Sequence, residues 1–337
     1  MLDVLIVGGG PAGAAAAITC ARAGLDAVIL ERHAEPADKP GETLHPGVEP
    51  LLERLGVADQ VRAAGFLRHE GIDISWDAAP RFEAYGGDAN GPWQGFQAWR
   101  ATFDQILLAA AESSGALVWR GIRVHHVRRG DQFVGVQTDR GPMQARWIVD
   151  ASGGTQWLGR QLRLPIERLS PKLICWYGYV RRQRGDRPTL RADAGGWTWK
   201  AEVRPGIYQW TRVAFDNQAP GAIEGDEIGK RRAADVTWRW FPRCADEGYF
   251  LVGDAAVVLD PASSHGVLRA LMTGMHAAHL MVASRGNEDL RSTAYRQYRT
   301  WLAAWVRHDA AAMRRLYARL PCPPAWVRPA LADTVTA

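Results

Sequence analysis

Runs of apolar positions at the start of the chain predict a strand, a helix and a second strand. The mostly apolar stretches 3–7 and 26–30 are typical of buried strands. The Ala-rich stretch 12–23 between them predicts a helix, which Gly24 ends. Two strands joined by a helix of this length form a βαβ unit with parallel strands. The chain therefore begins as an α/β fold.

Further along, helical and strand-like patterns alternate and then give way to short β-like runs. Apolar spacing predicts helices at 46–55, at about 57–64, at 101–114, at 267–284 and onward to about 320. Alternation predicts strands at 70–76, 81–85, 117–119, 123–127, 133–138, 143–149 and 249–254. Between about 162 and 240, Gly, Pro and Asp separate short β-like runs at 173–181, 196–203 and 207–215.

This order predicts a Rossmann-like α/β domain with an inserted, mostly antiparallel β-sheet and C-terminal helices. The α/β domain is expected to be discontinuous, at 1–68, 95–160 and 242–285. The substrate domain is expected at 69–94 and 161–241, and the helical segment at 286–337.

Glycines after the first strand have the spacing of a dinucleotide site. Gly8 permits a tight turn, Gly10 lets the backbone approach a pyrophosphate, and Gly13 lets the helix lie close to the strand. The helix N-terminus offers N–H groups and partial positive charge to phosphates. Glu31 ends the second strand, where a carboxylate accepts hydrogen bonds from ribose hydroxyls. We expect dinucleotide binding, the alternative being a tight turn without a ligand.

Composition is that of an ordinary globular protein: 337 residues, 47% of them hydrophobic and 23% charged. The net charge of +5 falls on the C-terminal segment, because nine Arg against four acids follow from Arg285 onward. Such a segment is typical of a solvated helix face, or of a surface that docks an acidic partner. Nothing in the composition points to nucleic acid.

Four widely spaced cysteines form neither a CxxC pair nor a metal-ligand pattern. We therefore expect a reduced, cytoplasmic setting with no disulfide framework and no metal site. The first strand begins almost at residue 2, which leaves no room for a signal peptide, and no apolar run is long enough to span a membrane.

Three later motifs join the glycine fingerprint. They are Arg100 at a helix start, Asp150 in IVDASGG, and Gly253–Asp254 before a loop with Pro261 and Gly266. As a set they resemble the FAD-binding domain of para-hydroxybenzoate-hydroxylase-type monooxygenases and of their relatives, the flavin-dependent halogenases and geranylgeranyl reductases.

The resemblance implies FAD as the resident cofactor. It places Asp254 at the ribitol and pyrophosphate, Arg100 near the phosphates, and the helix start Gly266–Val267 at the flavin pyrimidine end. For Arg100 a surface helix position is the alternative. The implied FAD-binding residues are Gly8, Gly10, Pro11, Ala12, Gly13, Glu31, Arg32, Glu42, Thr43, Arg100, Asp150, Asp254, Pro261, Gly266 and Val267. Since no second G-x-G-x-x-G is present, electrons are expected from NAD(P)H directly or through a flavin reductase.

Two stretches resemble flavin-dependent tryptophan halogenases. GETLHP at 41–46 is similar to their G-E-x-x-x-P, and GWTWKAEV at 196–203 is similar to their G-W-x-W-x-I-P. However, His69 stands where halogenases carry a lysine, and Ser263 stands where they carry a glutamate. We therefore expect halogenase architecture with different chemistry.

These motifs, with SSHGVLRALMTG, resemble flavoproteins encoded with cysteine tryptophylquinone amine oxidases and dehydrogenases. That resemblance implies FAD- and O₂-dependent hydroxylation of a tryptophan in a partner protein, through a flavin C4a-hydroperoxide, during quinone cofactor biogenesis. The alternatives are halogenation or hydroxylation of a small indole or phenol, a geranylgeranyl-reductase-like FAD reductase, and a non-catalytic FAD-binding maturation chaperone.

Proton transfer during such a reaction needs an acid–base group beside the flavin. The candidates are His265, His69, Glu42 and His45. For each of them, the alternative is an ordinary core or surface residue. His265 comes first because its loop is expected beside the flavin, and His69 second by its halogenase correspondence.

Substrate contacts are expected from the Trp-rich sheet and the adjoining loop. Trp197 and Trp199 occupy alternate positions of one strand and so share a face, either of a cavity or of the core. Ser263 and Ser264 lie in the loop before the helix start.

Overall fold

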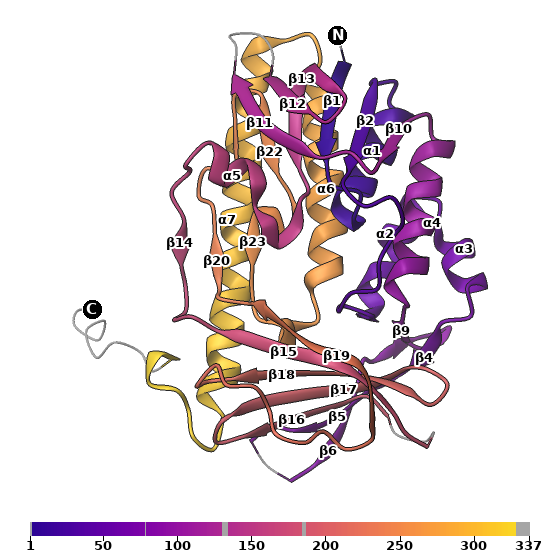
Figure 1. Ribbon diagram of the computed structural model, residues 1–337, viewed down its shortest axis with the longest axis vertical. Coiled ribbons are helices and arrows are strands. Elements are labelled where there is room, and N and C mark those ends of the chain that lie inside the picture. Colours follow the sequence, from indigo (N-terminus) through magenta and orange to yellow (C-terminus); the bar gives the residue numbers. More distant parts are fainter. Residues whose placement is uncertain (1, 78, 130–133, 184–186, 328–337) are drawn as a thin grey trace.

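Two large β-sheets, one near each end of the molecule, organise the chain (Figure 1). The computed structural model describes residues 2–77, 79–129, 134–183 and 187–327. The first sheet carries helices and holds the N-terminal βαβ unit, whereas the second lies across the other end. The long helix α7 (Glu288–Ala318) runs from one sheet to the other.

The first sheet has the order β10-β2-β1-β13-β12-β11, and β22 and β21 extend it from β13. Its strands are β1 (Leu2–Val7), β2 (Ala27–Glu31), β10 (Leu117–Arg120), β11 (Val124–Arg129), β12 (Val134–Thr138), β13 (Gly141–Asp150), β21 (Ala245–Asp246) and β22 (Tyr249–Leu251). β1 pairs in parallel with β2 and β13, and β13 pairs in parallel with β22. The carboxyl ends of these strands therefore meet at one edge, where open α/β sheets bind ligands.

Helices cover this sheet and set the geometry of that edge. They include α1 (Pro11–Arg22), α4 (Arg100–Ser113) and α6 (Gly266–Ala283). Helix α1 packs against α6 so closely that a Cβ on Gly274 would lie 2.2 Å from the carbonyl oxygen of Ala12. Only glycine allows this approach, which fixes the two helices against each other.

The second sheet has the order β19-β15-β18-β17-β16-β5-β6. Its strands are β5 (Gly71–Ser75), β6 (Arg81–Ala84), β15 (Ile174–Arg181), β16 (Thr189–Asp193), β17 (Gly196–Arg204), β18 (Ile207–Ala214) and β19 (Asp226–Asp235). All neighbouring strands are antiparallel except β16 and β5. The predicted fold class, an α/β domain with an inserted, mostly antiparallel sheet, is thus confirmed, while the exact domain boundaries stay a prediction.

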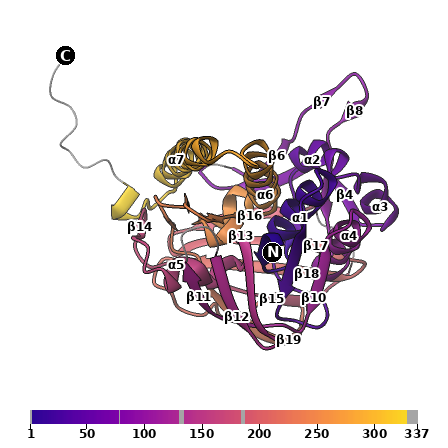
Figure 2. The same cartoon turned by 90° about the horizontal axis from the view of Figure 1, so that it is seen from above.

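Shorter elements complete the described residues. Two further sheets have three strands each. One has the order β3 (Thr43–Leu44), β9 (Gly95–Gln97), β4 (Leu67–His69), and the other has the order β14 (Glu167–Arg168), β20 (Arg239–Trp240), β23 (Val257–Val258). The hairpin β7 (Gly87–Asp88) and β8 (Gly91–Pro92) projects from the molecule (Figure 2). Short helices are α2 (Glu49–Arg54), α3 (Ala58–Ala63) and α5 (Trp157–Gln161), with 3-10 turns at Pro46–Val48, Gly153–Thr155, Gly253–Ala255, Pro261–Ser263 and Ala325–Val327.

Some predicted boundaries differ from the structure. The expected helix 46–55 is a 3-10 turn followed by α2, and the expected strand 249–254 ends at Leu251. Strand β19 was not predicted, because it is mostly exposed and polar on both faces and so shows no alternation. The first position of the expected strand 133–138, and positions 328–337 of the C-terminal segment, lie outside the described residues.

A buried polar junction joins the second sheet, α7 and the turn before α6. Asp260 is 1% exposed, and its Oδ2 accepts hydrogen bonds from the Tyr317 hydroxyl (2.5 Å) and from Trp238 Nε1 (3.1 Å). The Tyr317 oxygen in turn accepts from Trp197 Nε1 at 2.8 Å. Burial raises the pKa of Asp260, and the donors around it oppose that rise. The Tyr317 hydroxyl therefore ties α7 to the second sheet through Trp197 and to the turn before α6 through Asp260.

Replacing Tyr317 by phenylalanine should destabilise the protein. The ring packing is kept, but the buried indole N–H of Trp197 and an oxygen of Asp260 each lose a partner. We expect the free energy of unfolding, measured by urea denaturation, to fall by about 3 kcal/mol.

The control for Tyr317→Phe is Trp93→Phe. It removes the hydrogen bond from a half-exposed indole to Asp88, for which water can substitute, so we expect a change below about 1 kcal/mol. An equal fall in the free energy of unfolding of the two variants would contradict the stabilising role of this junction.

Candidate functional site

The turn between β1 and α1 has the shape that a phosphate site requires. Gly8 has a φ of +109°, and a Cβ on Gly13 would lie 2.0 Å from the Gly8 carbonyl oxygen. At Gly10, by contrast, no described atom outside its immediate neighbours comes within 4 Å of the Cβ position. An open space thus lies beside the first N–H groups of α1, which have no partner within the helix. These residues fit a pyrophosphate.

Glu31 closes this turn. Its Oε2 accepts from the Gly9 backbone N–H at 2.7 Å, and its Oε1 accepts from the His33 N–H at 2.8 Å. Each carboxylate oxygen keeps a further lone pair, so acceptance from a ribose hydroxyl stays a prediction. The neighbouring Arg32 is exposed and donates from Nε to the His33 ring.

A second part of the site is formed where β22 meets α6. The Gly253 N–H donates to Thr273 Oγ1 at 2.8 Å, which holds the turn carrying Asp254 against the helix. The Asp254 side chain is 51% exposed, and its Oδ1 lies 3.7 Å from Nη2 of the buried Arg269. Nε and Nη1 of Arg269 have no hydrogen-bond partner among the described residues. A buried guanidinium with free donors suits an anionic ligand.

Asp150 serves the protein's own backbone. It is fully buried, with Oδ1 accepting from the Ser152 N–H (3.0 Å) and Oδ2 from the Leu158 N–H (2.8 Å). Burial raises the pKa of Asp150, and these donors oppose the rise. Asp150 therefore shapes the loop after β13, and its predicted contact with FAD has no support beyond its place at the sheet edge.

Arg100 is neither exposed nor free, so the alternative of a surface position is wrong. Its guanidinium pairs with Asp104 on the same helix, with Nη2 3.0 Å from Oδ1, and Nη1 donates to the Pro40 carbonyl at 3.1 Å. Lys39 Nζ lies 2.7 Å from Asp104 Oδ2. Arg100 thus holds the segment before the 41–46 loop onto α4, and a role at the phosphates stays a prediction.

The 41–46 loop carries a buried acid that reaches the second sheet. Glu42 is 2% exposed, and its Oε1 accepts from the Tyr179 hydroxyl of β15 at 2.5 Å. Its Oε2 has no hydrogen-bond partner in the described part of the chain. Burial raises the pKa of Glu42 to about 7, so this carboxyl changes charge near neutral pH.

Two predicted histidines, His45 and His69, lie against Tyr85, and the third, His265, lies against His45. The Tyr85 ring lies 5.2 Å from the His45 ring and 5.4 Å from the His69 ring, and His45 lies 5.9 Å from His265. Tyr85 stands where the predicted strand 81–85 ends and a turn-rich stretch begins, and nothing in that pattern marks it as a site residue. The structure therefore brings His45, His69 and His265 into one row of rings.

Hydrogen bonds fix the proton positions on two of these rings. His45 Nδ1 accepts from the Gly47 N–H at 3.0 Å, and His69 Nδ1 donates to the Gly71 carbonyl at 3.2 Å. Burial lowers the pKa of His69 to about 4, and burial followed by the neighbouring His265 lowers the pKa of His45. Both rings are neutral at pH 7, His45 with its proton on Nε2 and His69 with its proton on Nδ1.

The loop before α6 meets the 41–46 loop. Ser264 Oγ donates to the Thr43 carbonyl at 3.4 Å, which joins the two loops. Ser263 Oγ donates to the Asp260 carbonyl at 2.8 Å in the 3-10 turn that begins at Pro261. Ser263 is thus part of the turn, while Ser264 lies at the junction of the loops.

Trp197 belongs to the core and not to a cavity wall. It is 1% exposed, and its indole N–H is bonded to Tyr317. Trp199 is partly buried and packs against the same core. Of the two alternatives for Trp197, the structure favours the core, because its indole N–H is already bonded inside the protein.

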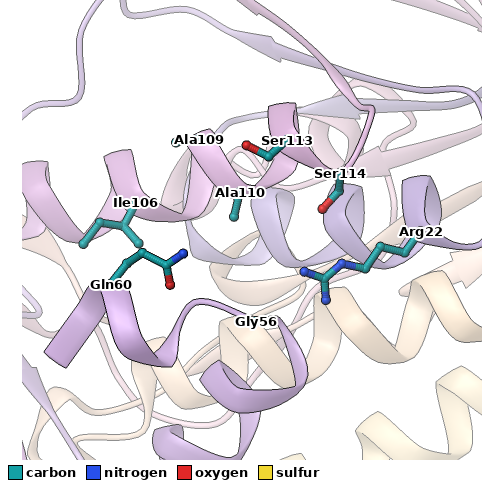
Figure 3. Close-up of a pocket in the computed structure, with 8 residues that line it drawn as sticks. All are labelled: Arg22, Gly56, Gln60, Ile106, Ala109, Ala110, Ser113 and Ser114. Carbon is teal, nitrogen blue, oxygen red and sulfur yellow. The ribbon is translucent and has the colours of Figure 1, made fainter. Parts of the chain in front are cut away.

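Two surface hollows accompany these elements. One lies where α1, α3 and α4 meet (Figure 3), and there Arg22 donates to the carbonyls of Arg54 and Leu55 at the end of α2. None of the predicted site residues lines it. The other hollow is lined by His69 and Gln97, and the Gln97 Oε1 accepts from Thr43 Oγ1 at 2.9 Å. The second hollow thus adjoins the 41–46 loop.

Within the described ranges, no helix is both long and apolar enough to cross a membrane. The same residues contain no group of three His, Cys, Asp or Glu side chains placed to hold a metal ion.

Comparison with known proteins identifies the nucleotide domain. A family model described as "FAD binding domain" matches residues 1–181. The chain is 27% identical over 326 residues to a tryptophan 2-halogenase of Chondromyces crocatus, covering 83% of this chain and 60% of that protein. It is 28% identical over 324 residues to a menaquinone reductase of Mycolicibacterium smegmatis, covering 83% and 76%.

Solved structures show the same fold. The flavin-dependent halogenase CmlS superposes with a TM-score of 0.85 at 22% identity, covering 94% of this chain and 64% of that one. The chain thus spans less than two thirds of either halogenase.

Substitutions at two glycines should separate cofactor binding from folding. Gly10→Ala puts a methyl group into the open space, so we expect FAD affinity to fall by about tenfold or more with little change in the stability of the FAD-free protein. Gly13→Ala forces a methyl group against the Gly8 carbonyl and should lower the stability itself by about 1–3 kcal/mol.

Flavin fluorescence titration and thermal unfolding of the FAD-free variants measure these two effects. A Gly10→Ala protein that binds FAD as tightly as the wild type would contradict the assigned phosphate site.

Glu42→Gln should change how stability depends on pH. Because burial raises the pKa of Glu42 from 4.5 to about 7, its stabilising contribution is fully present below pH 4.5 and is lost as pH rises through 7. The glutamine does not titrate, so the variant should gain about 3 kcal/mol relative to the wild type over this interval.

Urea denaturation at several pH values measures the change for Glu42→Gln. The exposed Glu288→Gln should show no such trend. A constant difference between wild type and Glu42→Gln would contradict the raised pKa.

Proposed function

The chain belongs to the FAD-binding-domain family of flavoproteins, and on that premise we propose that it uses FAD and O₂ to functionalise an electron-rich aromatic ring. The observation that carries this proposal is the meeting of the 41–46 and 261–266 loops. It places His45 and His265 5.9 Å apart beside the N-terminus of α6. FAD, when bound, supplies the two-electron activation of O₂.

The chain's own residues have separate tasks in this proposal. The α1 N-terminus and Arg269 bind the phosphates, and the α6 N-terminus stabilises negative charge on the flavin ring. His265 takes the proton that the aromatic carbon loses, and Glu42 holds or releases a proton near pH 7. The hollow beside His69 and Gln97 is the proposed substrate entrance.

Halogenation is the first candidate reaction. Relatives named as halogenases support it over the partner-protein tryptophan hydroxylation that the sequence motifs favoured. In this reaction O₂ and two electrons from NAD(P)H oxidise one halide ion, a ring C–H bond is replaced by a carbon–halogen bond, and both oxygen atoms leave as water. The electrons arrive from NAD(P)H directly or through a reductase.

Hydroxylation, including that of a tryptophan in a partner protein, is the second candidate. It is favoured by the absence of a lysine from the described site. Lys39 and Lys200 are held in ion pairs with Asp104 and Glu224, and the chain's other two lysines are exposed. Here one oxygen atom enters the ring C–H bond, the other leaves as water, and NAD(P)H again supplies two electrons.

A mass measurement separates the candidates. FAD-loaded protein is supplied with NADH, a flavin reductase, O₂ and catalase, with and without bromide, and is offered tryptophan, a phenol and a Trp-containing peptide. Halogenation gives a bromine isotope pattern only with bromide, whereas hydroxylation adds one oxygen atom in both conditions. Reduction of menaquinone without O₂ would instead support a reductase, the activity that the name of the mycobacterial relative gives. Absence of both aromatic products would overturn the proposal.

His265→Gln should lower the rate of product formation by about a hundredfold, because it removes the proton acceptor. The matched control is His308→Gln, at an exposed position of α7, which should keep the wild-type rate. Product mass spectrometry under saturating FAD measures both. Equal rates in the two variants would remove His265 from the mechanism.

A further inference from the structure

Helix α7 carries a buried carboxylate to His265. Asp309 is 5% exposed, and its Oδ2 lies 3.6 Å from His265 Nδ1. Neither atom has a hydrogen-bond partner among the described residues. Burying a polar atom without a hydrogen-bond partner costs about 1–3 kcal/mol of stability. A hydrogen bond between these two atoms would give each of them the partner that it lacks.

The position of Asp309 is set on both sides along α7. Tyr298 donates its hydroxyl to the Leu251 carbonyl at 2.7 Å, which fixes α7 to the end of β22. Tyr317 fixes the far end through Asp260. Between these anchors, the Trp305 ring lies 6.4 Å from the His265 ring. Asp309 is therefore presented by a rigid segment and not by a mobile loop.

We propose that Asp309 is a positioning residue whose carboxylate holds the Nδ1 proton of His265, so that Nε2 is the nitrogen that faces the substrate. This inference rests on the proposed function, in which His265 takes a proton. Nε2 lies on the opposite edge of the ring from Nδ1 and therefore points away from α7. The separation of 3.6 Å is of the kind that shortens when an active site is occupied.

The other groups that face His265 make no hydrogen bond to its Nδ1 within the described residues. His45, from the 41–46 loop, is committed through its own Nδ1 to the Gly47 N–H. Trp305 of α7 has no charge, and the His265 backbone N–H and carbonyl serve the turn and α6. Asp309 is thus the acidic partner of His265 among the described residues.

The proton position on His265 tests this inference directly. The FAD-loaded protein is labelled with ¹⁵N-histidine, and the neutral tautomers are distinguished by long-range ¹H–¹⁵N correlation spectra. His265 is assigned by the signals that His265→Gln removes. We expect the Nδ1–H tautomer in the wild type and in Asp309→Glu, and mainly the Nε2–H tautomer in Asp309→Asn. The control Asp289→Asn, at the exposed start of α7, should match the wild type.

Kinetics give a second readout with the same variants. In the aromatic oxidation assay, Asp309→Asn should lower kcat by about tenfold or more with KM nearly unchanged, and Asp309→Glu should recover most of the loss. Binding of FAD should be equal in all of them, because Asp309 does not reach the phosphate site.

The two readouts fail separately. An unchanged Nδ1–H tautomer in Asp309→Asn overturns the positioning role, whatever the activity. If the wild type forms no aromatic product, the proposed function fails, while the tautomer still decides the role of Asp309. If Asp309→Asn does not bind FAD, the smaller Asp309→Ser replaces it in the same comparison, with the same outcomes.

Discussion

The reaction end of this protein depends on one buried carboxylate. Asp260 accepts hydrogen bonds from a tyrosine of α7 and a tryptophan that follows β19, and from the backbone N–H of Ala262 in its own turn. The turn leads directly into His265 and the start of α6. This junction fixes the position of the loop that carries His265 relative to the helix that carries Asp309. The second sheet therefore supports the site although it lies at the other end of the molecule.

Sequence reasoning succeeded where the signal is local. The glycine spacing at 8–13, the apolar strands on both sides of it and the carboxylate of Glu31 are all contained in one βαβ unit, and each follows from backbone geometry. Five strands of the second sheet, β5, β6, β15, β17 and β18, follow from alternation and turn residues, whereas β16 and β19 do not. Each of the histidines 45, 69 and 265 is a separate prediction, and the row of rings that they form with Tyr85 is a property of the fold.

The rest could not be predicted because it depends on pairs far apart in the chain. Glu42 and Tyr179 are 137 positions apart, and neither shows a pattern that would identify the other. In the sequence, Asp309 is an ordinary polar position on a basic helix, and Arg269 is an ordinary polar position on α6. The choice between cavity and core for Trp197 stayed open for the same reason, since only the fold reveals that Tyr317 accepts its indole N–H.

The tight contact between Gly274 and Ala12 fixes how far α6 extends past the start of α1. Ala12 lies at the start of α1, beside the phosphate site, whereas Gly274 lies eight positions after the start of α6 at Gly266. At a rise of about 1.5 Å per residue, the two helix N-termini are separated by roughly 12 Å along α6. Since neither helix can slide along the other, the distance between the N-terminus of α1 and His265 is fixed.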